Sequence, residues 1–521
     1  MVTIDMPPEM ARFVQRLQTD PNDYEANKAV ALFLRSKPET HSQSLNFFAR
    51  ALSHNRASDP DHRSLLETYS ETLFVNGEFE SAIKPLEVLL TTYPTDALYM
   101  TYLAHAGFRT GRAEMAFEVA RKIVERLYGL ALERSERSGD PITQILVPNN
   151  ILRSHFGELA IKLDLYGKAR ILGLTPETRA LLPVLEEEVV NGCLFRCLKS
   201  SLSHVIDFPS SAEERNAWLE KYSGSLLVRT EYYTDPQGRG LDMSHFCVLV
   251  QRHWEQSGRG PLVSLPDKYD EAGWNLLRSH GLPDGGWFVC FHMRSGGYRP
   301  DATDGGIAYY RNSTMEDYIP AMQAVRKRGG WVVRLGDPSM PPLPDMEGVI
   351  DYAVSDWRED WIDVFLLARN RFFVGVPSGP NAVAHTFGVP IVEINRFPFN
   401  DWPANSNVIS IFKRYRRISD GGYLTIEEMA SPAIRGLFSK SAFDAKGIEG
   451  VDNSPEEIRN TVVEMLDRLE GVIEYTAEDD SPQERFDTAV DLFKVGVNIR
   501  IGRDFLNKHR PLLGQATSRH A

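Results

Sequence analysis

Short apolar stretches alternate with amphipathic ones along the second half of the chain. Runs of five or six mostly apolar residues occupy 287–292, 331–335, 348–352, 371–375 and 389–394. Between them lie segments whose apolar positions follow helical spacing, or turns rich in Gly and Asp. This is the pattern of strands that helices cover on both faces. It predicts a doubly wound parallel sheet.

Local signals mark where several of the intervening helices begin and end. The sequence Ser-Thr-Met-Glu at 313–316 has the spacing of a capping box, and the following helix is expected to stop at the glycines 329–330. Asp360 is expected to cap a helix over 361–368. Ser378 precedes a helix that ends at Phe387.

The segment 1–138 carries an internal repeat. Gly77 and Ala82 recur as Gly111 and Ala116, and the glycines and the alanines are separated by the same distance in sequence. That distance matches the tetratricopeptide period of about 34 residues, in which a pair of helices packs against its neighbours. The repeat units are expected at 63–96 and 97–130, with a degenerate unit at 29–62. A plain bundle of helical hairpins is the alternative.

The middle of the chain opens a second α/β unit. A linker at 138–141 leads to a β-rich run at 142–147, and a helix follows from 156 to Gly173. Short strands and helices are expected to alternate over 190–280. The sequence therefore predicts two Rossmann-like lobes behind a helical array, with boundaries at 1–138, 139–283, 284–475 and 476–521.

Composition narrows the class of protein. The 521 residues include 58 Lys and Arg against 71 Asp and Glu, a net charge of −13, which disfavours nucleic acid as the main partner. Four cysteines are too few for a disulfide framework, and no run reaches the ~18 apolar residues of a membrane helix. We expect a cytoplasmic protein without a membrane span. No cluster has the spacing of metal ligands, and the acidic stretch 478–480 is interpreted as a linker.

Ligands of open α/β sheets bind beyond the carboxyl ends of the strands, so residues there are the first candidates. His292 and Arg294 share one face at the end of the first strong strand, and Gly296 and Gly297 behind them let a backbone approach a ligand closely. The planar guanidinium of Arg294 has the geometry to bind two phosphate oxygens. The alternatives are a core histidine, which is favoured for His292, and a surface ion pair for Arg294.

The turn at Ser378, Gly379 and Asn381 leads from a strand into a helix. Free N–H groups and the helix dipole at such a start attract anions. An ordinary strand-to-helix turn is the alternative. The turn is a candidate anion site mainly because we expect it on the same sheet edge as Arg294.

Other candidates follow the neighbouring strands. Asp337 either binds a ribose or base, or caps the turn before Pro338. Ser355 and Asp356 follow the next strand, and Asp356 is preferred to Asp360 and Asp363, which suit a helix start. In addition, Arg311 either reaches the same anion or holds its loop.

Two further groups face the expected cleft or the surface. His155 and Glu158, at the start of the first helix of the middle unit, are candidates for deprotonating an acceptor hydroxyl, with capping or core roles as the alternative. The basic run 413–417 suits either an anionic acceptor or lipid headgroup, through a peripheral contact, or a solvated loop.

The stretch from 288 to 395 resembles a family of bacterial glycosyltransferases of the two-Rossmann (GT-B) type. The similarity lies in the motifs FHMRSGGYR, RNSTMEDYIPA, GGWVVRLGDPSM, SDWREDWIDVFLLARNRFFVG, SG and FGVPIVEIN. That family is similar to the protein O-fucosyltransferase and nodulation fucosyltransferase superfamily in its His-x-Arg strand end. The overall resemblance covers about residues 140–475. The segment 380–385 is more polar than the family pattern.

The resemblance implies a nucleotide-sugar donor as co-substrate, and we expect no metal or other cofactor beside it. It implies that Arg294 contacts the donor diphosphate, that Ser378 and Gly379 hold its phosphates, and that Asp337, Ser355 and Asp356 lie near base and ribose. A repeat array ahead of such lobes also resembles cytoplasmic glycosyltransferases that modify proteins such as flagellin.

The expected function is therefore transfer of a sugar to a protein that the repeat array recruits. A lipid-linked or polysaccharide acceptor is one alternative, and a non-catalytic scaffold that binds a nucleotide sugar is another. A sugar-nucleotide epimerase or dehydrogenase is disfavoured because no strand is followed by Gly-x-Gly-x-x-Gly at a helix start.

Overall fold

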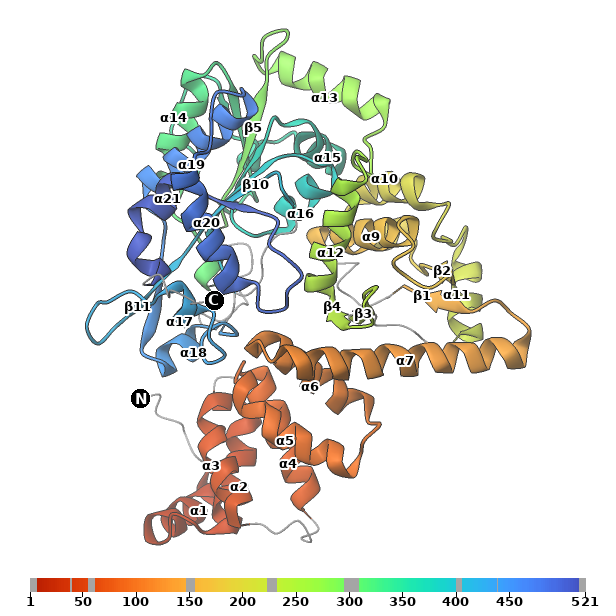
Figure 1. Cartoon of the computed structure of the whole chain (residues 1–521), viewed down its shortest axis with the longest axis vertical. Coiled ribbons are helices and arrows are strands. Elements are labelled where there is room, and N and C mark those ends of the chain that lie inside the picture. Colours follow the sequence, from red (N-terminus) through yellow and green to blue (C-terminus); the bar gives the residue numbers. More distant parts are fainter. Residues whose placement is uncertain are drawn as a thin grey trace.

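The computed structural model describes residues 7–37, 40–54, 61–146, 155–222, 232–294, 309–399, 405–437 and 439–514. The chain has an α/β fold in which a helical array is followed by a mostly helical middle region and a seven-stranded parallel sheet (Figure 1). The α/β class and the N-terminal array predicted from the sequence are thus confirmed.

The array consists of α-helices joined by short turns. They are α1 (Pro8–Thr19), α2 (Tyr24–Arg35), α3 (His41–His54), α4 (His62–Val75), α5 (Phe79–Thr92), α6 (Ala97–Thr110) and α7 (Ala113–Ser138). Helices α5 and α7 begin at Phe79 and Ala113, which are as far apart in sequence as Gly77 and Gly111. The predicted period is therefore that of the helices.

Glycine and alanine occupy the turn and packing positions of this repeat. Gly77 and Gly111 each adopt a φ of 76°, in the left-handed region that favours glycine, and so turn the chain between paired helices. Ala82 and Ala116 are wholly buried where those helices pack. The predicted turn and packing positions are confirmed.

The middle region contains two small sheets among helices. Its elements are β1 (Thr143–Ile145), α9 (Phe156–Ile171), β2 (Arg179–Leu181), α10 (Gly192–Leu202), α11 (Ala212–Lys221), β3 (Tyr232–Thr234), β4 (Gly240–Asp242), α12 (Met243–Gln256) and α13 (Asp267–Ser279). Strands β1 and β2 are parallel and are joined through α9, while β3 and β4 form an antiparallel hairpin. The described part of 190–280 is mainly helical, so the alternation predicted there is wrong.

The large sheet lies in the C-terminal half. Its strands are β5 (Phe288–His292), β6 (Trp331–Leu335), β7 (Val349–Ile350), β8 (Phe373–Gly375), β9 (Ile391–Arg396), β10 (Val408–Phe412) and β13 (Arg500–Ile501), in the order β13-β10-β9-β8-β5-β6-β7. The five strands predicted from apolar runs are present. Strands β8, β9 and β10 are wholly buried. Strands β8 and β10 are accordingly almost entirely apolar, whereas β9 also buries Glu393, Asn395 and Arg396.

Helices cover this sheet on both faces. The helices of the C-terminal half are α14 (Ile319–Lys327), α15 (Asp360–Arg369), α16 (Gly379–Thr386), α17 (Ile426–Met429), α18 (Lys440–Ala445), α19 (Pro455–Leu469), α20 (Ala477–Val490) and α21 (Arg503–Lys508). Helices α14 and α19 pack together, whereas α15 and α16 contact the middle region through α10 and α9.

Three helix boundaries differ from their predictions. Thr314 leads into a 3-10 turn over Met315–Tyr318, so no capping box forms at 313–316. Helix α15 begins at Asp360 itself, and Glu359 precedes it. The acidic stretch 478–480 is the first turn of α20, where negative charge complements the helix dipole, and it is not a linker.

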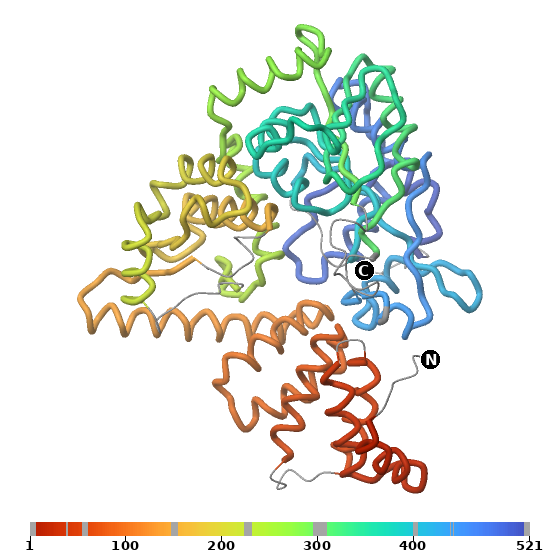
Figure 2. Tube along the Cα trace, turned by 180° about the vertical axis from the view of Figure 1, so that it is seen from behind, coloured from red at the N-terminus to blue at the C-terminus, as the bar shows by residue number. Residues whose placement is uncertain are grey.

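The array, the middle region and the segment around Phe493 share a core. Phe108 of α6, Leu165 of α9, Phe246 of α12 and Phe493 belong to one buried cluster. In Figure 2 the long helix α7, which runs along the edge of the middle region, connects the array to the rest of the chain. Removing the array would therefore expose apolar surface of the remaining protein.

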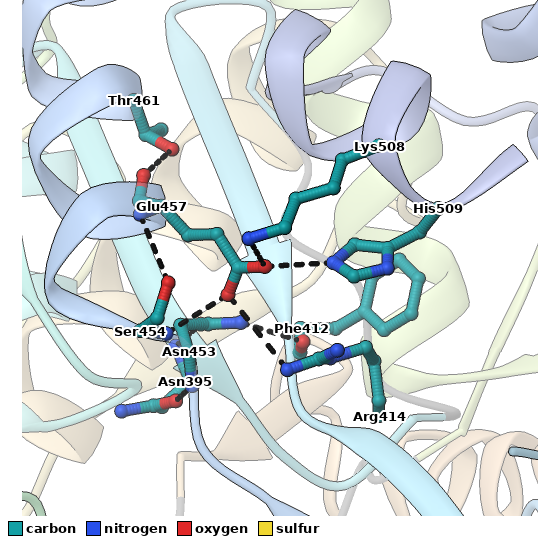
Figure 3. A network of polar contacts seen from close by, with 9 residues as sticks. All are labelled: Asn395, Phe412, Arg414, Asn453, Ser454, Glu457, Thr461, Lys508 and His509. Carbon is teal, nitrogen blue, oxygen red and sulfur yellow. Dashed lines mark hydrogen bonds and ion pairs between the residues drawn. The ribbon is translucent and has the colours of Figure 1, made fainter.

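Lys508 and His509, at the end of α21, bind to the sheet domain through a polar network around Glu457 on α19 (Figure 3). The buried Glu457 carboxylate accepts from Lys508 Nζ at 3.0 Å and lies 2.7 Å from His509 Nε2. It also accepts from the Ser454 backbone N–H in a capping box. The residues after α20 thus belong to the same packed unit as the sheet, to which they also contribute β13.

Candidate functional site

The strand order creates a switch point between β5 and β8. From β5 the chain crosses to β6 in one direction, and from β8 it crosses to β9 in the other. His292 and Gly375, the last residues of these two strands, are paired in register. Such a point is where ligands of open α/β sheets bind, beyond the carboxyl ends.

Two candidates meet at this point. The Nδ1 atom of His292 lies 3.2 Å from Ser378 Oγ. Removal of the imidazole from water and the nearby charge of Arg294 lower the pKa of His292 to about 4. His292 is therefore neutral at neutral pH, and Arg294 lies close to the pair. The contact between His292 and Ser378 joins the end of β5 to the start of α16, and the approach of Arg294 to Ser378 stays a prediction.

The chain beyond β5 returns to the same edge. Arg294 pairs with Asn312 in a parallel bridge, and its carbonyl accepts from the Ser313 N–H at 3.1 Å. Arg311 lies in the 3-10 turn just before this bridge. Gly296 and Gly297 lie outside the described residues.

Two helix N-termini converge beside this histidine and serine. Helix α16 follows Ser378 and α9 follows His155, and neither residue caps its helix with its side chain. A β-carbon built on Gly157 would lie 2.7 Å from the Cα of Gly379. The two helix starts thus touch through their backbones, and their dipoles add positive potential at one place.

This contact brings the candidates of the middle region to the site. His155 directly precedes α9, and Glu158 lies in the first turn of that helix. The Glu158 carboxylate forms an ion pair with Lys162 at 3.2 Å and is 39% exposed. The sequence reasoning missed Gly157, although a glycine in the first turn of a helix is a signal of close backbone approach.

The candidates that follow β6 and β7 have local partners. Asp337 Oδ1 accepts from the Ser339 N–H at 3.0 Å, so it caps the turn, as in one of its two interpretations. Ser355 Oγ donates to the Tyr352 carbonyl at 2.9 Å. Asp356 is exposed at the same edge. The Asp356 side chain is therefore open to a ligand, whereas Asp337 Oδ1 is already engaged in the turn.

Asn381 is held by a buried network under α16. Its Nδ2 donates to Glu393 Oε1 at 3.1 Å, and Glu393 also accepts from Arg396 at 2.5 Å and from Ser410 at 3.1 Å. Asn381 therefore has a buried partner on β9, and the contact helps to orient α16.

Asp363, which the sequence analysis did not favour as a binding residue, has a raised pKa. Burial raises the pKa of Asp363, in the first turn of α15, to about 6, against the lowering effect of a hydrogen bond with Tyr352. Asp360, at the helix start, is exposed, and its carbonyl accepts from Asn191 Nδ2 at 3.0 Å. Asp363 faces the core beside Cys290 rather than the switch point.

The basic run is not a solvated loop. Residues Arg414–Arg417 form strand β11, which pairs with β12 (Ile448–Val451). Each cation of the run has a carboxylate partner: Lys413 with Asp452, Arg414 with Glu457, Arg416 with Glu449 and Arg417 with Glu428. The neutralised run offers little charge to a lipid headgroup.

No protein-family model matches the chain, and no curated protein matches it. The resemblance to two-Rossmann glycosyltransferases accordingly stays a prediction. In the described part of the chain no helix is both long and apolar enough to cross a bilayer. Nor do the described His, Cys, Asp and Glu side chains form a group of three suited to a metal ion.

Proposed function

We propose that the protein is a glycosyltransferase that takes a sugar from a nucleotide diphosphate donor bound at the β5–β8 switch point. The single observation that carries this proposal is the convergence of Arg294, His292 and two uncapped helix starts on one sheet edge. A guanidinium and free backbone N–H groups are suited to a diphosphate.

The two parallel sheet systems support a two-lobed interpretation of this site. Strand β1 leads through α9 to the parallel strand β2, just as β8 leads through α16 to β9. Helices α9 and α16 both begin at the meeting point of Gly157 and Gly379. Two α/β units whose helix starts face each other are the arrangement expected of a GT-B enzyme, with the acceptor approaching from the side of α9.

In the proposed reaction negative charge builds on the diphosphate as the bond to the sugar breaks. Arg294 and the helix starts stabilise that charge, and a well-placed donor of this kind contributes about 3–4 kcal/mol. We propose that they do so without a metal ion. His155 and Glu158 are the candidates for accepting the proton of the acceptor hydroxyl.

Donor binding is the first test. Each of a panel of nucleotide diphosphates and monophosphates is added to the purified chain, and the melting temperature is recorded. A tight ligand raises it by mass action, and the best one identifies the base. Donor turnover with and without EDTA then tests the chemistry. Turnover that EDTA abolishes would contradict a metal-independent reaction, and tight binding with zero turnover would favour a scaffold.

The acceptor is proposed to be a protein that the array recruits. Exposed apolar side chains on the array, among them Leu98 at 53% and Val75 at 50%, are suited to such contacts. Because deleting the array would open a shared core, the better test is Leu98→Asp, with Val472→Asp outside the array as control. Protein glycosylation that falls only for Leu98→Asp, at unchanged donor hydrolysis, supports recruitment. Equal transfer by both variants would favour a lipid-linked or polysaccharide acceptor.

A further inference from the structure

Arg435 differs from the other buried Lys and Arg side chains of the described residues because it has no carboxylate partner. The described part of the chain buries the side chains of Lys168, Arg334, Arg396, Lys413 and Arg435. The first four pair with Asp164, Asp351, Glu393 and Asp452. Arg435, only 4% exposed, has no carboxylate within ion-pair distance among the described residues. An unpaired buried charge is costly, and this one calls for a counter-charge.

The guanidinium of Arg435 lies at the junction of the array and the α/β parts. Its Nε and Nη1 atoms are buried and have no hydrogen-bond partner in the described structure. The group lies over the Phe493 ring, 5.2 Å from its centroid. A β-carbon on Gly111, at the end of α6, would be 2.9 Å from Arg435 Nη1. Glycine at that turn thus leaves room beside the guanidinium.

A second arginine lies beside the first. A β-carbon on Gly436 would be 3.3 Å from the Arg109 carbonyl oxygen, so the end of α6 touches the residue next to Arg435. Burial and the charge of Arg109 lower the pKa of Arg435 to about 10, which agrees with two neighbouring guanidinium groups. Arg109 Nε donates to His105 Nε2 at 3.2 Å. Burial, above all, lowers the pKa of His105 to about 3, so that histidine adds no negative charge.

The carboxylate that acts on both arginines is engaged elsewhere. Asp242 caps α12: its Oδ1 accepts from the His245 N–H at 2.9 Å and lies 2.6 Å from His245 Nδ1. Two arginines thus face one carboxylate that already has partners, and the cluster keeps an excess of positive charge. The cluster is not sealed, because Arg109 is partly exposed and the Asp242 side chain is 26% exposed.

We propose that Arg435 and Arg109 form a binding site for a phosphate-class oxyanion at the junction of the array with the α/β parts. The planar fork of a guanidinium matches the oxygens of such an ion, and two forks in proximity supply the charge to hold it. The bound anion neutralises the buried Arg435 and links α6 to the segment after α17. The site is separate from the switch point and does not depend on the proposed glycosyl transfer.

Phosphate binding to the full chain tests the site. Equilibrium dialysis with labelled inorganic phosphate is compared for the Arg294→Ala chain and for Arg294→Ala combined with Arg435→Met, so that binding at the switch point does not confuse the result. We expect one ion per chain in the first and at least tenfold weaker binding in the second. Phenyl phosphate as competitor distinguishes a free phosphate ion from a phosphate ester as the natural ligand. Displacement of the labelled ion indicates that the site also takes a phosphate carried on an organic group. No displacement indicates that the site takes the free ion.

Thermal unfolding gives an independent readout. In phosphate-free buffer Arg435→Met is expected to melt at or above the wild-type temperature, because an unpaired buried charge is gone. Millimolar phosphate is expected to raise the wild-type melting temperature by about 2 °C or more and to leave the variant unchanged. Should Arg435→Met fail to fold, Arg109→Gln, at a partly exposed position, replaces it. Wild-type phosphate affinity in both variants, or no phosphate binding to the Arg294→Ala chain, would overturn the proposal.

Discussion

Gly157 and Gly379 bring the first turns of α9 and α16 into backbone contact, although they belong to units far apart in the sequence. A β-carbon on Gly157 would approach the Gly379 Cα to 2.7 Å and the Ala382 Cβ to 3.2 Å. The first distance is shorter than real β-carbons allow, and backbone cannot move aside as a flexible side chain does. The absence of a side chain at Gly157 is therefore what lets the two helix starts share one site.

Replacing Gly157 by alanine is expected to push the two helices apart. Overpacking of this kind costs about 1–3 kcal/mol of unfolding free energy, and the widened contact should also weaken nucleotide diphosphate binding. Denaturant unfolding and ligand titration measure the two effects.

Gly129→Ala is the matched control for this substitution. Gly129 lies within α7, and a β-carbon there would meet nothing within 4 Å. Its replacement should stabilise the helix by up to about 1 kcal/mol. A Gly157→Ala chain as stable as the control would show that the helix starts are not in close contact.

Arg294→Ala is expected to lower the kcat of donor turnover by about two orders of magnitude, the effect of losing one contact to developing charge. Arg294→Lys should recover part of it, because lysine restores the charge but not the planar fork. Arg328→Ala, which removes a cation paired with Asp467 and Glu470 away from the switch point, is the control. Near-normal turnover by Arg294→Ala would exclude the phosphate role.

The sequence predicted the parts of the fold that depend on local pattern. Five strands of the large sheet were found because buried parallel strands are apolar along most of their length, as 287–291 shows. Strand β13, a short pair of residues at 500–501, is too brief for any pattern to reveal, and its place is fixed by pairing with β10. The capping signal at 313–316 failed because the bridge between Arg294 and Asn312 draws that segment to the sheet edge.

The candidate site was predictable to the same extent. The meeting of His292 and Ser378 follows from the rule that parallel strands end on one edge. The contact of Gly157 with Gly379 depends on how two distant units pack, which no local spacing encodes. The carboxylates that neutralise 413–417 likewise come from distant segments, so a run of basic residues is by itself a poor guide to the charge of the surface.

Glu457 should make the protein sensitive to acid. Although burial alone would raise its pKa, hydrogen bonds from His509, the Ser454 backbone and Lys508 outweigh it and hold the pKa of Glu457 at about 2. Because the folded-state pKa lies below the unfolded value of 4.5, the stabilisation is present above pH 4.5 and is lost as the pH falls towards 2. Glu457→Gln should therefore lower the unfolding free energy by about 3 kcal/mol at pH 7.

The pH profile separates this effect from simple loss of packing. The difference in unfolding free energy between the wild type and Glu457→Gln should stay constant from pH 7 to 5 and shrink below pH 4.5. Glu456→Gln, at the exposed neighbouring position of the same helix, should change stability little. A difference that does not depend on pH would contradict the ion-pair account.

His385 should also make the protein sensitive to acid, but for a different reason from Glu457. Its imidazole is buried in the neutral form. Burial, helped by the nearby Lys168, lowers the pKa of His385 to about 3. The unfolded chain takes up a proton at this residue below about pH 6.5, while the folded chain does not, so each step down in pH favours unfolding.

Relative to His385→Gln, the wild type should lose about 3 kcal/mol of unfolding free energy between pH 7 and 4.5. His253→Gln, at an exposed position of α12, is the control for removing a histidine. Denaturant unfolding at half-unit pH intervals measures all three curves, and a His385→Gln curve parallel to the wild type would mean that this imidazole is protonated in the folded protein.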